Sequence, residues 1–286
     1  MRESLRLLAD WLFDYAGMFP PASLPVEGAW TRYEEHLASP RAAIVSRFAC
    51  ASDSLAPLAD VLLQNSEPGL GHEITVVASA KGDWGDTLEA AAQAMTGFIE
   101  RVDSERAALT AFEVALPDAA ELPLRVQDLR SFQEVDVYLE LPWEPWQPEA
   151  FQAVAEEPGL LAKARTGGAR VPSSRELASW IEAAIQEEQP FKLTAGLHHA
   201  LRSDEEHGFV NVIAALALGI ANDFAHEEIV QVLEERQARA FEFGESALRW
   251  RGSESGRDAL EDARGLLGSI GSCAIEDAWE DLQKWA

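Results

Sequence analysis

Short apolar runs alternate with longer amphipathic stretches along almost the whole chain. This alternation is typical of a parallel β-sheet whose strands are connected by helices. Helical periodicity is clearest over residues 86–101 and 174–187, and the second stretch follows a Pro-Ser-Ser sequence at 172–174 that suits a helix start. Strands are predicted at residues 14–19, 44–50, 74–79, 111–116, 135–141, 160–165, 191–196 and 268–275.

Eight strands that alternate with helices predict a single (β/α)8 barrel of the TIM type over residues 1–286. The interval between the seventh and eighth strands is longer than one helix requires, so residues 200–262 are expected to form a helical insertion or lid. Within it, the sequence predicts an apolar helix near 209–220, a charged helix near 227–240 and a hairpin at 241–251. An open, doubly wound sheet is the alternative architecture.

The fourth to seventh predicted strands each have one apolar face and one face that carries charged residues. The outer face of a barrel strand packs under helices, so the charged face is expected to point toward the barrel axis. Active sites of this fold lie at the C-terminal strand ends. The sequence therefore predicts one cavity lined by Glu113, Glu140, Lys163, Arg165 and Lys192. A buried ion-pair network that only holds the barrel interior together is the alternative.

The charge of the chain is strongly one-sided, because 49 acidic and 23 basic residues give a formal net charge of -26. A surface of this sign repels phosphate backbones and anionic lipids, which argues against nucleic acid and membrane partners. No apolar run is long enough to span a bilayer and the N-terminus lacks a leader-like segment, so a cytoplasmic protein is expected. The two cysteines, Cys50 and Cys273, lie in predicted strands, where buried free thiols are expected.

Lysine is scarce in this sequence, which makes its positions informative. The chain has four lysines, and two of them, Lys163 and Lys192, lie within predicted strands. Lysine differs from arginine because it can lose its proton and act as an amine nucleophile. We expect Lys192 and Arg165 to lower the pKa of Lys163, so that its amine forms a Schiff base with a carbonyl. Either Glu113 or Glu140 would transfer protons in this reaction. Three cations and two carboxylates leave the cavity with one net positive charge, which suits a small anionic substrate.

Three short motifs resemble class I aldolases of the deoxyribose-phosphate aldolase type. They are LAKARTGG at 161–168, FKLTAG at 191–196 and IGSC at 270–273. The resemblance implies that Lys163 is the nucleophile and Lys192 its partner, in a lyase that needs no cofactor. Loop residues at the same strand ends are expected to bind the substrate, partly through backbone N–H groups. This substrate-binding set comprises Arg165, Thr166, Gly167, Thr194, Gly196, His198 and His199.

A second resemblance covers more of the chain. The phrases FDYAGMFPPA, AKARTGG, KLTAGLHHALR, HGFVNV and GSCAIED resemble those of a bacterial protein family to which no reaction is assigned. This resemblance is consistent with the barrel and implies no particular chemistry.

Two alternatives to the lysine hypothesis remain open. The first is a divalent metal ion bound by Asp14, His198, His199 and His207, because the first and seventh strands of a barrel have ends that adjoin. The protein would then be a metal-dependent lyase, isomerase or hydrolase. The second is a non-catalytic protein on a barrel scaffold. It predicts a filled interior in which Lys163 pairs with Glu140 and no cavity opens to solvent.

Overall fold

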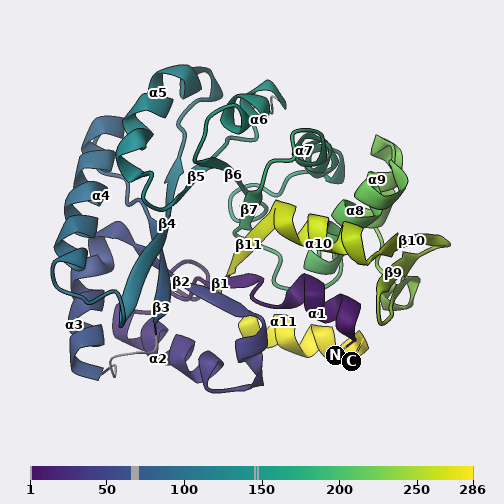
Figure 1. Ribbon diagram of the computed structural model, residues 1–286, viewed down its shortest axis with the longest axis horizontal. Helices are drawn as coiled ribbons and strands as arrows, with labels where there is room; N and C mark the ends of the chain where they lie inside the picture. Colours follow the sequence, from purple (N-terminus) through teal and green to yellow (C-terminus); the bar gives the residue numbers. More distant parts are fainter. Residues whose placement is uncertain (1, 66–70, 145, 147, 286) are drawn as a thin grey trace.

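In the computed structural model, which describes residues 2–65, 71–144, 146 and 148–285, eight parallel strands close into a barrel (Figure 1). The predicted TIM-type fold is thereby confirmed. The strands follow one another around the barrel in the order β1, β2, β3, β4, β5, β6, β7, β11, and β11 pairs with β1 to close it. Their bounds are β1 Phe13–Tyr15, β2 Val45–Ala51, β3 His72–Val77, β4 Ala107–Ala115, β5 Asp136–Glu140, β6 Leu160–Arg165, β7 Phe191–Thr194 and β11 Leu267–Ser272.

A helix follows each barrel strand and covers its outer face. The start signal at 172–174 is used as predicted, because Ser173 and Glu176 form a reciprocal capping box at the beginning of the helix after β6. A further short helix, α1 (Glu3–Ala9), precedes β1. The helices after the strands are α2 Val26–Leu37, α3 Leu55–Asn65, α4 Trp84–Ile99, α5 Leu122–Leu129, α6 Pro148–Ala155, α7 Ser174–Gln186, α8 Phe209–Asn222 and α11 Ile275–Leu282. None of the described helices is long and apolar enough to cross a membrane.

The strand register places the charged residues next to one another. Glu140 of β5 pairs with Lys163 of β6, and Lys163 pairs with Lys192 of β7. Their strand neighbours Ala162 and Leu193 are fully buried and face the opposite way, toward the helices. Parallel strands carry side chains in register on the same face, so the charged residues of β4 to β7 all point toward the barrel axis.

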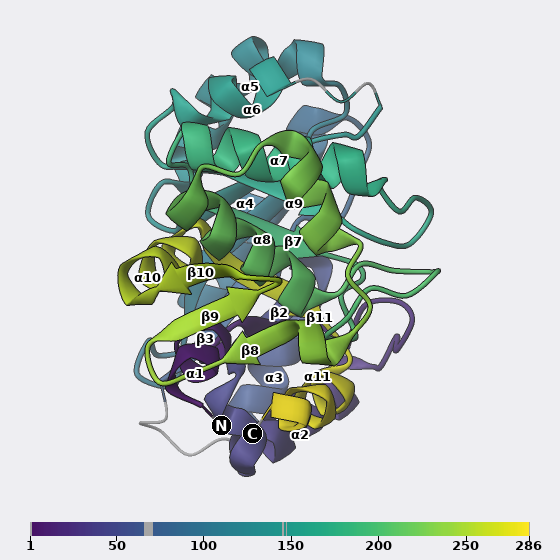
Figure 2. The same ribbon diagram turned by 90° about the vertical axis from the view of Figure 1, so that its right-hand side faces the viewer.

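The segment between β7 and β11 contains more than the predicted helices and hairpin. After α8 come α9 (His226–Leu233), a three-stranded antiparallel sheet and α10 (Arg257–Leu266). The sheet faces the viewer in Figure 2 and consists of β8 (Phe241–Phe243), β9 (Ala247–Trp250) and β10 (Ser253–Gly256). The third strand escaped prediction because its sequence, SESG, lacks the apolar alternation of a strand.

The predicted charged helix at 227–240 ends earlier than its sequence pattern indicates. Its last helical residue is Leu233, and the buried carboxylate of Glu235 then accepts hydrogen bonds from the backbone N–H groups of Arg236 and Gln237. The same carboxylate accepts a hydrogen bond from the Arg251 side chain at 2.8 Å. A side chain that takes over the backbone donors in this way competes with the helix.

The extra elements cover α8 rather than the cavity mouth. Residues 209–219 of α8 are buried without interruption, because α7, α9, α10 and β10 all pack against this helix. A helix covered on every side is apolar all round. The exception in this buried stretch is Asn211, whose side-chain amide donates to the backbone oxygens of Val232 and Glu235. Within the predicted insertion, residues 203–206 line a hollow at the C-terminal strand ends.

Candidate functional site

A cavity of about 110 Å³ lies at the C-terminal ends of the barrel strands. Its charged lining residues come from β4, β6 and β7, and the loops after β1, β7 and β11 form its rim. It borders an outer hollow of about 830 Å³, with which it shares Pro20, Arg165, Ala195 and His198. The inner lining includes Glu113, Lys163, Arg165, Lys192, Thr194, His198 and Cys273. Glu140, which the sequence predicted to line the cavity, is not among its lining residues but forms an ion pair with Lys163, which is.

A continuous chain of ion pairs crosses the floor of this cavity. Lys163 Nζ lies 2.8 Å from Glu140 Oε2 and 2.7 Å from Glu113 Oε2. The other oxygen of Glu113 lies 2.6 Å from Lys192 Nζ, which in turn pairs with Asp14. The side chains of Lys163, Glu113, Lys192 and Asp14 are each 5% exposed or less. Four buried charges that alternate in sign compensate one another in a region from which water is largely excluded.

Asp14 ends this chain, and the surrounding strands satisfy its carboxylate. One oxygen accepts hydrogen bonds from the hydroxyls of Thr75 and Ser269, both at 3.1 Å, and from Lys192. The other oxygen accepts the backbone N–H of Arg47 at 3.3 Å. A buried carboxylate needs such donors to offset the loss of its hydration. Asp14 therefore holds Lys192 in place.

The expectation that neighbouring cations lower the pKa of Lys163 is wrong for this arrangement. Burial opposes the charged form, but the carboxylates of Glu113 and Glu140 outweigh it and raise the pKa of Lys163 above its usual range. The pKa of Lys192 is raised for the same reason, with Asp14 and Glu113 as its partners. Both lysines are therefore protonated at neutral pH.

Glu113 has the opposite perturbation. Burial raises its pKa, but the ammonium groups of Lys163 and Lys192 more than reverse this and lower the pKa from its ordinary value of 4.5 to about 2. The carboxylate is thus a fixed negative charge between two cations. The sequence-based charge count also changes, because Asp14 adds a third carboxylate and offsets the expected excess of positive charge.

Arg165 lies at the mouth rather than on the floor. Its side chain is exposed and lines both the cavity and the outer hollow. Its guanidinium lies close to Gly168, where an added Cβ would be 3.3 Å from Nη2. An exposed guanidinium at this position is available to an anion that enters from the hollow.

The loops after β6 and β7 approach each other closely. Strand β7 ends at Thr194 rather than at 196, because Ala195, Gly196 and Leu197 all have positive φ values of 59°, 139° and 57°. Thr166, predicted to bind substrate, instead donates its hydroxyl to the backbone oxygen of Thr194 at 3.3 Å. Gly167 packs against Ala195 so tightly that a Cβ there would lie 2.1 Å from the Ala195 oxygen. The buried Thr194 hydroxyl has no hydrogen-bond partner among the described residues.

Replacing Gly167 by alanine is expected to lower the free energy of unfolding by about 1–3 kcal/mol, because the clash is with backbone that cannot rotate away. Gly97→Ala is the matched control, since nothing lies within 4 Å of a Cβ added there in α4. Alanine favours a helix over glycine, so this control is expected to be neutral or slightly stabilising. Urea unfolding measures both. A Gly167→Ala variant as stable as the wild type would show that the two loops do not meet this closely.

The residues proposed to bind a metal have different partners. Asp14 is buried beneath Lys192, and His207 Nε2 lies 2.8 Å from the backbone oxygen of Pro172. His199 Nδ1 lies 3.3 Å from Asp281 Oδ2 near the surface, whereas His198 lines the cavity. Among the residues that the structure describes, no group of three or more His, Cys, Asp or Glu side chains is arranged to hold a metal ion. The four proposed ligands are therefore not brought together.

The sequence analysis did not single out two residues of the site, Cys273 in the inner cavity and Glu206 in the outer hollow. Cys273 was placed inside a strand at 268–275, but β11 ends at Ser272, and Cys273 is half-buried and lines the cavity. Glu206 lies 3.1 Å from His198 Nδ1 through its Oε2. A correct prediction of the end of β11 would have placed Cys273 in the loop at the cavity rim. For Glu206 the sequence contains no indication beyond its position eight residues after His198.

The sequence matches no protein-family model and no curated protein. The resemblance of the three short motifs to class I aldolases therefore stays a prediction.

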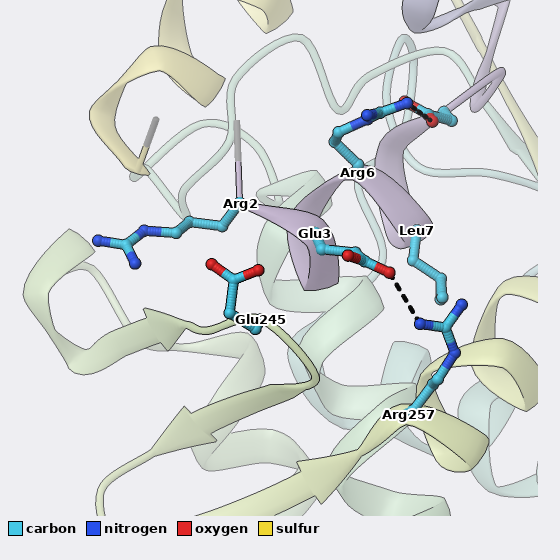
Figure 3. A pocket seen from close by; sticks show the side chains of 7 residues that line it. Arg2, Glu3, Arg6, Leu7, Glu245 and Arg257 are labelled. Carbon is cyan, nitrogen blue, oxygen red and sulfur yellow. Dashed lines mark hydrogen bonds and ion pairs between the residues drawn. The ribbon is translucent and has the colours of Figure 1, made fainter.

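A second hollow, of about 740 Å³, lies between α1, the β8–β9 turn and α10 (Figure 3). Its side chains form exposed ion pairs, such as Glu3 Oε1 with Arg257 Nη1 at 2.8 Å. Exposed pairs of this kind contribute little to stability. None of the site residues predicted from the sequence lines this hollow.

Proposed function

We propose that this protein is a barrel enzyme that acts on a small anionic carbonyl compound through a Schiff base on Lys163, as a lyase of the aldolase type. The observation that carries the proposal is the position of Lys163. Its ammonium reaches a cavity at the C-terminal strand ends and lies within 2.8 Å of two carboxylates. A non-catalytic scaffold would pair Lys163 with Glu140 as well, but it would leave no such cavity.

Lys163 suits the role of nucleophile better than Lys192. The Lys163 side chain retains 5% exposure, whereas that of Lys192 has none. Lys192 is also held between Asp14 and Glu113, deeper in the barrel. Its charge fixes Glu113, and Glu113 in turn orients the Lys163 amine. In this proposal Lys192 is a positioning residue.

Attack on a carbonyl requires the neutral amine, so Lys163 must first pass a proton to a carboxylate. Glu113, with a pKa of about 2, is a poor base. Glu140 contacts one ammonium and its side chain is 18% exposed, so we assign it the role of proton acceptor. The amine then forms the C–N bond, and the carbonyl oxygen takes one proton from the attacking nitrogen and one from protonated Glu140 and leaves as water. The protonated imine that remains is an electron sink for the neighbouring C–C bond.

The mouth of the cavity suits an anionic group on the substrate. Arg165 presents an exposed guanidinium, and Thr194 has a buried hydroxyl that a ligand oxygen would satisfy. Together they would orient a carboxylate or phosphate while the carbonyl carbon faces Lys163. The cavity volume of about 110 Å³ favours a compound of few atoms.

Borohydride trapping tests the proposal, and the low lysine content makes the test sharp. The protein is incubated with a panel of small aldehydes, ketones and 2-oxo acids, reduced with borohydride and weighed by intact-mass spectrometry. We expect a stable adduct in the wild type and in the control Lys81→Arg/Lys284→Arg, which removes the two lysines outside the barrel. Lys163→Arg keeps the positive charge and is expected to abolish the adduct.

Circular dichroism and a thermal melt verify that Lys163→Arg remains folded. An adduct that persists in this variant would contradict the proposal. Failure of every compound on the panel to form an adduct with the wild type would contradict it as well.

A further inference from the structure

A second group of reactive side chains lies on the cavity wall, away from the lysine chain. His198, in the loop after β7, places its Nδ1 3.1 Å from Glu206 Oε2. Cys273, which follows the end of β11, is the neighbour with the largest effect on the pKa of the His198 imidazole. His198 and Cys273 both line the inner cavity, and Cys273 is a free thiol. The proposed Schiff-base chemistry uses none of these three residues.

The position of Glu206 is fixed by its own loop. Its backbone N–H donates to the Ser203 hydroxyl at 3.1 Å, and its backbone oxygen accepts the Ser203 N–H at 3.0 Å. Glu206 thus belongs to a closed turn rather than to a free segment. A nucleophile, a base and a third group that orients the base form the pattern found at many covalent catalytic sites.

The electrostatics of the histidine agree with this arrangement. Hydrogen bonds with Cys273 and then with Glu206 raise the pKa of His198 to about 10, against the opposing effect of burial. The imidazole therefore carries its proton at neutral pH. A histidine beside a cysteine can exchange a proton with it, and the thiolate that results is the nucleophilic form.

We propose that Cys273 is a second nucleophile of the cavity, paired with His198, which Glu206 orients, and that it adds to small aldehydes. The thiolate sulfur forms a bond to the carbonyl carbon, and the carbonyl π pair moves to the oxygen. That oxygen takes the proton from His198 and leaves a thiohemiacetal beside a neutral imidazole. No oxidant, reductant or further reactant is required, and the step reverses by the same path.

The chain contains its own control for this proposal. It has two cysteines, and Cys50 is fully buried in β2, where burial raises the pKa of its thiol to about 12. A small alkylating reagent applied to the whole protein should therefore distinguish the two thiols. We expect iodoacetamide at neutral pH to label Cys273 and to leave Cys50 unlabelled, as measured by peptide mass spectrometry.

The histidine partner is tested by substitution. In His198→Gln the imidazolium is removed, and the alkylation rate of Cys273 is expected to fall about tenfold or more. Glu206→Gln retains the imidazole and is expected to give an intermediate rate, so it serves if His198→Gln fails to fold. Labelling of Cys273 at the wild-type rate in both variants would overturn the proposal.

Protection by acetaldehyde tests the addition step and separates it from Schiff-base formation. Acetaldehyde is expected to slow the alkylation of Cys273 in the wild type and equally in Lys163→Arg, which lacks the amine. Protection that disappears in Lys163→Arg would mean that an imine on Lys163 blocks the cavity, and it would overturn aldehyde addition to Cys273. Protection retained in that variant supports the thiol whether or not the Schiff base forms.

Discussion

Replacing Lys192 by methionine is expected to lower the free energy of unfolding at neutral pH by about 3–5 kcal/mol, the usual cost of removing one partner from a buried ion pair. Lys192 is completely buried between Asp14 and Glu113. Without it, Glu113 keeps its contact with Lys163, whereas Asp14 is left with neutral donors from Thr75, Ser269 and the Arg47 backbone. Methionine has a similar volume, so the loss measures charge compensation more than a cavity.

The pH dependence of this deficit identifies its cause. A buried carboxylate that loses its contacting ammonium favours its protonated form more than before, so folded Lys192→Met takes up a proton more readily than the folded wild type does. The difference in stability from the wild type is therefore expected to shrink as the pH falls from about 7 to about 5. Loss of packing alone would give a difference that does not depend on pH.

Urea unfolding at several pH values measures this effect, and Lys284→Met is the matched control. Lys284 is half-exposed and pairs with Asp281 at 2.6 Å, so its removal is expected to change stability by less than about 1 kcal/mol. A Lys192→Met variant that is as stable as Lys284→Met would show that the buried chain of ion pairs is not what holds the barrel interior together.

The sequence allowed the barrel and much of its interior to be predicted for one physical reason. In strands such as Asp136–Glu140 and Leu160–Arg165, alternating side chains form an apolar face that packs under helices and a polar face that points toward the barrel axis. The structure brings Glu113, Lys163 and Lys192 together on that second face. The alternation of side chains is a property of each strand by itself, so it can be read from the sequence of that strand alone.

The partners of these residues were not predictable in the same way. Asp14 lies in a strand of three residues, too short for alternation to assign its face, and it was considered only as a ligand of the alternative metal site. Its pairing with Lys192 depends on barrel closure, which brings residues 178 positions apart into contact. The prediction that the pKa of Lys163 is lowered was wrong for the same reason. The shift depends on which charges contact the ammonium, and these are the carboxylates of Glu113 and Glu140.

Under the proposed function, Lys192 has a structural role and Lys163 a chemical one. Lys192, fully enclosed, neutralises Asp14 and one oxygen of Glu113, and Lys163 meets the other oxygen at the cavity floor. Because Glu113 is shared, the stability of the barrel and the position of the Lys163 amine, the nucleophile of the proposed function, depend on one carboxylate. A site built on side chains that are locked by buried neighbours needs little reorganisation when a substrate enters.

Glu113 is accordingly expected to dominate the acid sensitivity of the fold. Its pKa is lowered from 4.5 to about 2 in the folded protein, so the folded state holds this proton less tightly than the unfolded chain does. The resulting stabilisation is fully present above about pH 4.5 and is lost as the pH falls toward about 2. By linkage it amounts to about 3 kcal/mol.

Glu113→Gln removes this titration and leaves two ammonium groups around a neutral amide. The variant is expected to be less stable than the wild type at neutral pH, and the gap should close by about 3 kcal/mol as the pH falls through the range from about 4.5 to about 2. Glu105→Gln, at an exposed carboxylate, is the control and should lose stability in acid in parallel with the wild type. Urea unfolding measured across this range decides the matter. If Glu113→Gln also runs parallel to the wild type, Glu113 is not the carboxylate that the two lysines keep ionised.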